Sequence, residues 1–180
     1  MKKKIGIVSV LALCTLLVAA IITLSAVKVN NLPNLGNPDW IMIYSSASSS
    51  ERVLTKGQEK YDEFVETFND CFTEQLISAL FSGRIKGDYD VNADGNVSPT
   101  KPYVKYKFDN AQTLTIKGET IYDPSNTTKE VTYNEVYFNV SENNEKEDVK
   151  IYLRNSSSKS VYSFIVYVNL YDVFEFIAEC

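Results

Sequence analysis

Histidine is absent from this sequence of 180 residues. Its absence excludes Ser-His-Asp and Cys-His nucleophile systems, the HExxH zinc motif and most catalytic zinc sites, because each of these depends on imidazole. The G-x-S-x-G motif of serine hydrolases does not occur either. Carboxylate pairs, Ser-Lys pairs and metal ions held by oxygen ligands are the site chemistries left open.

Cysteine is scarce, with Cys14, Cys71 and Cys180 as its three positions. Two cysteines in one domain are too few to form a recognisable disulfide framework. Two interpretations stay open for them. Cys71 and Cys180 either form a disulfide, or Cys71 is a buried thiol and Cys180 an incidental one.

Basic residues are fewer than acidic ones, and three of them are clustered at Lys2, Lys3 and Lys4. Beyond that cluster the chain carries 15 basic and 23 acidic residues, a net charge of −8. Nucleic acids and anionic lipid surfaces both require clustered Lys and Arg. The charge balance therefore argues against both as partners, and it is compatible with cationic partners or metal ions.

One stretch has no charged residue at all, from Ile5 to Val27. As a helix its 23 residues span about 34 Å, and a bilayer has a hydrocarbon core of about 30 Å. The three lysines before it favour a cytoplasmic N-terminus. We therefore expect residues 1–27 to be an uncleaved signal anchor that crosses the lipid bilayer through residues 5–27, with the rest of the chain outside the cell.

Two alternatives to this anchor are a secreted protein and a lipoprotein, each released by signal cleavage. A signal peptide has a shorter apolar core and small residues at its cleavage site, whereas Leu24-Ser25-Ala26 begins with leucine. Leu11-Ala12-Leu13-Cys14 resembles a bacterial lipobox, with Leu13 where a small residue belongs.

The rest of the chain is expected to form a linker, residues 28–38, and one extracytoplasmic domain, residues 39–180. Two prolines, a glycine and several asparagines rule out a regular helix in the linker. The outer domain is long enough for one core, and the whole chain is 44% hydrophobic and 12% aromatic.

A β-hairpin and a long amphipathic helix are predicted first in this domain. Residues 40–44 and 51–54 are β-prone and flank a serine-rich turn. Thr55 and Gln58 have the spacing of a capping box, and apolar residues then recur every three or four positions as far as Leu80. These signals predict a helix over about 56–82, with Gly83 at its end. We interpret the acidic face of this helix as a surface that is exposed to solvent.

Strand patterns follow over residues 103–108, 113–122, 131–140, 149–153 and 161–168. The last of these is continuously apolar, which predicts a central strand. A helical period over residues 170–178 predicts a short closing helix. Segregated elements of this kind indicate an α+β domain in which the long helix packs on an antiparallel sheet. The alternative is a β-sandwich with a peripheral helix.

Three segments carry a family resemblance: Ser78-Ala79-Leu80-Phe81-Ser82-Gly83, Val104-Lys105-Tyr106-Lys107-Phe108 and Tyr133-Asn134-Glu135-Val136-Tyr137-Phe138. The outer domain is similar in these segments to small signal-anchored extracytoplasmic proteins of unknown function from Gram-positive bacteria. The resemblance implies a compartment and an architecture. It implies no activity.

One segment has the spacing of metal ligands, because residues 90–98 follow the pattern D-x-N-x-D-G-x-x-S. The pattern resembles a single EF-hand or dockerin calcium loop, in which the ligands would be Asp90, Asn92, Asp94, Asn96 and Ser98. Lys101 occupies the position of the usual bidentate acid, and Pro102 precedes a strand where the motif has a helix. The alternative is a polar surface loop, since Asn, Asp and Gly all favour turns.

Three functions are compatible with these patterns. The first is a non-enzymatic, membrane-anchored domain that binds an envelope protein or polymer or has a structural or accessory role. The second is a weak calcium-binding surface module, and the third is a carboxylate-dependent hydrolase. An aromatic carbohydrate platform containing Tyr61, Tyr103 and Tyr106 is a further interpretation, for which sheet packing is the simpler explanation.

Overall fold

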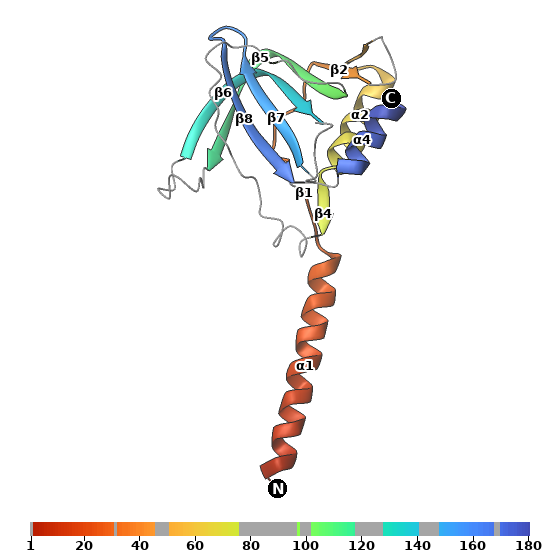
Figure 1. Ribbon diagram of the computed structural model, residues 1–180, viewed down its shortest axis with the longest axis vertical. Coiled ribbons are helices and arrows are strands. Elements are labelled where there is room, and N and C mark those ends of the chain that lie inside the picture. The colour runs from red at the N-terminus through yellow and green to blue at the C-terminus, as the bar shows by residue number, and fades with distance from the viewer. Residues whose placement is uncertain are drawn as a thin grey trace.

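The structure is a computed structural model of the chain, and it describes residues 2–30, 32–45, 51–75, 97, 102–117, 128–140, 148–167 and 170–180. It begins with helix α1, Lys2–Ala26. Figure 1 shows α1 extending away from the rest of the chain. The side chains described in α1 are those of residues 12–23 and 26. Within the described residues, no helix is long and apolar enough to cross a membrane.

A six-stranded antiparallel sheet forms the body of the protein, in the order β3-β2-β5-β6-β7-β8. Its strands are β2 (Trp40–Tyr44), β3 (Arg52–Thr55), β5 (Tyr103–Lys117), β6 (Thr128–Asn139), β7 (Asp148–Asn155) and β8 (Ser160–Tyr167). The described residues form this one large sheet and a separate two-stranded pair. The predicted α+β class is therefore confirmed, and β2 and β3 form the predicted hairpin.

Helices α2 (Glu59–Asp70) and α4 (Leu170–Glu179) lie side by side against one face of this sheet (Figure 1). The ring of Phe68 on α2 lies 5.0 Å from Phe138 on β6 and 6.0 Å from Tyr106 on β5, measured between centroids. Phe64 on α2 lies 5.2 Å from Phe176 on α4. We call the covered face of the sheet the inner face. The short closing helix and the packing of the long helix on the sheet are as predicted.

The register of the strands defines both faces, because successive residues of a strand point to opposite sides. One row across the inner face is fully buried from β2 to β8 and contains Ile43, Val104, Phe138, Ile151 and Phe164. A row across the opposite, outer face is polar and contains Lys107, Glu135 and Arg154. The apolar core thus lies between the sheet and the helices.

Helix α2 is much shorter than the predicted helix over 56–82. It ends at Asp70, and residues Thr73–Gln75 form strand β4, which pairs with β1, Lys28–Asn30. The side chain of Asn30 donates a hydrogen bond to the carbonyl of Asn69 (3.1 Å), one of the carbonyls that the last turn of a helix leaves without a partner. Residues 76–82 lie outside the described part of the chain.

The start of this helix also differs from the capping-box prediction. Thr55 is the last residue of β3, and the N-cap is Gln58. The side chain of Gln58 still accepts a hydrogen bond from the Thr55 amide (2.9 Å), as the motif predicts. Between them Gly57 has a φ of +90°, which glycine adopts without steric cost, so a turn separates strand from helix.

Strand β8 is at the edge of the described sheet, and the prediction of a central position is wrong. Its apolar residues are explained by burial on both faces instead. Val161 and Ser163 are buried on the outer face, while Phe164 and Val166 are buried on the inner face. A continuous apolar run indicates that both faces of a strand are buried, but it does not determine the position of the strand in the sheet.

Two further segments differ from their predicted form. The strands expected over 103–108 and 113–122 are one strand as far as Lys117, with a register shift between Lys107 and Gln112. Residues 28–38, expected as a linker, include strand β1 and contribute Leu35 to the core. The backbone there is anchored by the hydroxyl of Tyr133, which donates to the Leu35 carbonyl (2.9 Å).

Candidate functional site

The predicted calcium ligands, Asp90, Asn92, Asp94, Asn96 and Ser98, all lie outside the described residues. The calcium loop therefore stays a prediction. Among the residues that are described, no cluster of three or more Cys, Asp or Glu side chains could hold a metal ion. Ion networks and cavities of the described residues are the remaining candidates for a site.

An ion network lies on the outer face around Glu135, whose side chain is 9% exposed. Its carboxylate accepts from Lys105 (2.8 Å), from Arg154 (2.5 Å) and from the hydroxyl of Tyr137 (3.1 Å). Burial alone would raise the pKa of Glu135, but the hydrogen bonds from Lys105 and Arg154 outweigh it and lower the pKa. A carboxylate held ionised in this way is poorly suited to general acid–base catalysis near neutral pH.

The tyrosines considered for a carbohydrate platform do not lie together. Tyr61 and Tyr106 are buried in the core, whereas Tyr103 lies on the outer face, where its ring stacks on Tyr44 at 4.2 Å. Three residues of one platform would have to share a surface. The structure therefore rules out this set as a single platform.

The turn between β7 and β8 contains the S-x-x-K spacing of Ser-Lys enzymes, at Ser156 and Lys159. Both residues are exposed. The amide of Asn134 donates to the Ser156 hydroxyl (2.7 Å), and the Ser156 amide donates back to the Asn134 side chain (2.9 Å). This reciprocal pair fixes the turn on the neighbouring strand, which is a structural role for the serine.

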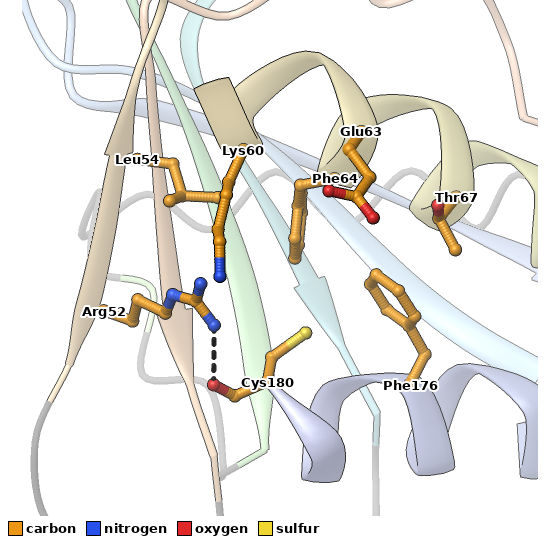
Figure 2. A pocket seen from close by; sticks show the side chains of 8 residues that line it. All are labelled: Arg52, Leu54, Lys60, Glu63, Phe64, Thr67, Phe176 and Cys180. Atoms are coloured by element: carbon orange, nitrogen blue, oxygen red, sulfur yellow. Dashed lines mark hydrogen bonds between the residues drawn. The ribbon is translucent and has the colours of Figure 1, made fainter. Parts of the chain in front are cut away.

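A cavity of about 230 Å³ lies where β3, α2 and α4 meet, and we call it the β3–α2–α4 pocket (Figure 2). It is lined by Arg52, Leu54, Lys60, Glu63, Phe64, Thr67, Phe176 and Cys180. Strand β3 brings Arg52 and Leu54 to the same face because they are two residues apart. Helix α2 brings Lys60, Glu63, Phe64 and Thr67 together because they are three or four apart.

The walls of this pocket differ in chemistry. Leu54 and Phe64 are buried, and Phe176 is half-buried beside them. Figure 2 shows the ammonium group of Lys60 and the guanidinium group of Arg52 pointing toward each other at one end. Figure 2 also shows the carboxylate of Glu63 directed along α2 toward Thr67. The pocket thus has an apolar wall, a cationic end and one acidic group.

Cys180 closes the pocket beside Arg52. The Nη1 of Arg52 donates to the main-chain oxygen of Cys180 (3.0 Å), which connects β3 to the end of α4. Burial raises the pKa of the Cys180 thiol, against the opposing effect of the nearby Arg52 charge. The structure contains no disulfide between Cys71 and Cys180.

The sequence does not indicate this pocket. The predicted helix over 56–82 contains Lys60 and Phe64, and the predicted hairpin contains Arg52 and Leu54. However, the pocket joins residue 52 to residue 180, and no local pattern indicates that the closing helix packs beside α2 at this point.

Comparison with known proteins found no matching family model, no matching curated protein and no matching solved structure.

Proposed function

We propose that this protein is a membrane-anchored extracytoplasmic domain that binds another component of the cell envelope, a protein or a polymer, and has no reaction of its own. The observation that carries the proposal is the direct connection of α1 to the domain. Helix α1 ends at Ala26, and β1 begins at Lys28 and pairs at once with β4. A 25-residue helix is about 37 Å long.

The orientation in this proposal comes from the charges of the sequence. Lys2, Lys3 and Lys4 precede the uncharged run, and positive charge is retained on the cytoplasmic side. The acidic remainder of the chain, with its net charge of −8, then faces outward. This charge keeps a domain soluble beside a membrane surface that is itself negative.

A binding role is supported by the chemistry of the two described sites. Glu135 is engaged by two cations, and its lowered pKa leaves it ionised at neutral pH. The β3–α2–α4 pocket combines aromatic rings with charged groups, which suits non-covalent contacts. The Glu135 network argues against acid–base catalysis, and the pocket suits non-covalent recognition.

Fractionation followed by N-terminal sequencing tests this function. We expect the protein to stay in membranes washed with alkaline carbonate and to keep the sequence that begins at Lys2 or Met1. Release by the wash, or a mature N-terminus at Val27 or Cys14, would contradict the anchor and support the secreted or lipoprotein alternative. A charged substitution within the run, Leu17→Arg, should shift the protein toward the soluble fraction, while Lys56→Gln should not.

A further inference from the structure

We propose that the β3–α2–α4 pocket binds a small organic monoanion, a carboxylate attached to a short aromatic or aliphatic body. The carboxylate lies between Arg52 and Lys60, and the body lies against Phe64 and Phe176. This inference goes beyond the proposed function and does not depend on the membrane anchor.

The cationic end of the pocket is formed by Arg52 and Lys60. Arg52 and Lys60 point toward each other (Figure 2), and neither forms an ion pair with an Asp or Glu side chain of the described residues. Two cations that face each other repel, and an anion placed between them removes that repulsion. The guanidinium group has five N–H donors, and the main-chain oxygen of Cys180 uses one of them. The remaining donors can bind a carboxylate.

The charge of the ligand follows from Glu63. This carboxylate lines the same pocket, so the lining side chains carry two positive charges and one negative charge, an excess of one positive charge. A monoanion neutralises that charge, whereas a dianion such as a phosphate monoester meets added repulsion from Glu63. A carboxylate is therefore favoured over a phosphate.

The size and apolar part of the ligand follow from the other wall. The rings of Phe64 and Phe176 are packed against each other, with centroids 5.2 Å apart and an interplanar angle of 51°, so they form one aromatic wall beside Leu54. The cavity of about 230 Å³ is smaller than the range of about 300–1,000 Å³ that is usual for drug-sized ligands. A single aromatic ring or a short aliphatic chain is the matching body.

The Cys180 thiol lines the pocket (Figure 2), so its rate of reaction with a thiol reagent can be used to measure binding there. The test uses the full chain in neutral detergent micelles, with Cys14→Ser and Cys71→Ser, so that Cys180 is the one reactive thiol. Its thiolate attacks a sulfur of 5,5′-dithiobis(2-nitrobenzoate), whose S–S bond breaks as a mixed disulfide forms and thionitrobenzoate leaves. Each half of this reagent is one aromatic ring with one carboxylate, so each half resembles the proposed ligand. The uncharged 4,4′-dithiodipyridine reacts by the same exchange and serves as the reference.

The measured quantity is the ratio of the rate with the anionic reagent to the rate with the uncharged one. We expect Lys60→Gln and Arg52→Gln each to lower this ratio about two- to fivefold, as for the loss of one exposed ionic contact. Glu63→Gln should raise the ratio, because it removes a negative charge from the site. Lys56→Gln, an exposed lysine outside the pocket, should leave it unchanged.

Taking a ratio separates the carboxylate contact from other effects of the variants. Arg52 also lowers the pKa of Cys180. The Arg52→Gln substitution therefore slows the reaction with both reagents by the same factor, and this effect cancels in the ratio. Lys60 is exposed on α2, so Lys60→Gln should fold normally even if Arg52→Gln does not. A second measurement uses 3-phenylpropionate, which should protect Cys180 from both reagents, and 3-phenylpropionamide, which should not.

Two results would overturn the inference. One is a ratio that is the same in the parent protein, Lys60→Gln and Glu63→Gln. The other is equal protection by the acid and by the amide, which would make the pocket an apolar hollow without anion recognition. Neither result would bear on membrane retention, so the proposed function would stand or fall separately.

Discussion

Two buried tyrosines show how one hydroxyl decides the effect of a substitution. Tyr106 and Tyr133 are each about 1% exposed. The Tyr133 hydroxyl donates to the Leu35 carbonyl (2.9 Å), whereas the Tyr106 hydroxyl has no hydrogen-bond partner among the described residues. Burial raises the pKa of both phenols, that of Tyr133 to about 12, so both stay neutral at physiological pH.

We predict opposite effects for the two tyrosine-to-phenylalanine variants. Tyr133→Phe should destabilise the protein by about 1–2 kcal/mol, because the Leu35 carbonyl loses its donor in a buried place. Tyr106→Phe should cause no loss and should stabilise by up to about 1 kcal/mol, because an unsatisfied buried hydroxyl is removed. Urea denaturation followed by Trp40 fluorescence measures both. A larger loss for Tyr106→Phe than for Tyr133→Phe would show that Tyr106 has a partner.

Glu135 should make stability depend on pH. Its pKa is lowered in the folded state, so the unfolded state binds more protons as the pH falls toward the usual carboxyl value of about 4.3. The contribution of the network is therefore fully present at neutral pH and is lost in acid.

We expect Glu135→Gln to cost about 3 kcal/mol at pH 7, because Lys105 and Arg154 are left without their counter-ion in a largely buried place. The difference in free energy of unfolding between the parent protein and the variant should become smaller as the pH falls below about 5. Glu66→Gln makes the same charge change at an exposed position and should cost less than about 0.5 kcal/mol at pH 7. If the loss of unfolding free energy in Glu135→Gln is the same from pH 7 to pH 3, Glu135 is not ionised in the folded protein.

At the scale of elements, helix α2 depends on its aromatic stripe. Phe68 is fully buried, and its ring lies 5.0 Å from Phe138 and 5.6 Å from Phe64. Phe68→Ala should cost about 3–5 kcal/mol through lost burial and the cavity that it leaves. That is a large share of a typical stability of about 5–15 kcal/mol.

The matched control for this prediction is Glu66→Ala, on the solvated face of the same helix. It should change the free energy of unfolding by less than about 0.5 kcal/mol. Denaturation midpoints that fall equally in the two variants would mean that α2 presents a different face to the sheet.

The existence of these elements could be predicted from periodicity, but their ends and order could not. The stripe through Phe64 and Phe68 indicated α2, and alternation indicated β5, β6 and β7. The end of α2 at Asp70 depends on β4 pairing with β1, which is about 45 residues earlier in the chain. The edge position of β8 depends on the order of the whole sheet. Both are tertiary contacts that a local pattern does not contain.

The candidate site was even less accessible to sequence reasoning. Arg52, Lys60 and Cys180 meet through the packing of three separate elements. Each looks like an ordinary surface or terminal residue when it is read along the chain. The predicted calcium ligands are the opposite case, because residues 90–98 carry a local pattern with ligand spacing, and that pattern stays a prediction.

At the scale of the whole molecule, the proposed anchor places the N-terminal lysines and the domain on opposite sides of the membrane. Lys2, Lys3 and Lys4 are proposed to lie in the cytoplasm, and the domain with Cys180 outside. Cys180 is partly exposed, so it can report the position of the domain in living cells. Its raised pKa makes labelling slower than for an ordinary thiol but does not prevent it at pH 8.

Labelling of single thiols in intact cells tests this arrangement most directly. One variant keeps Cys180 and replaces Cys14 and Cys71 by serine. The matched control replaces all three cysteines and introduces Lys3→Cys. We predict that a membrane-impermeant maleimide labels Cys180 in intact cells, and that it labels the thiol at position 3 only after the cells are permeabilised. Labelling of position 3 in intact cells, or labelling of Cys180 only after permeabilisation, would contradict the proposed topology.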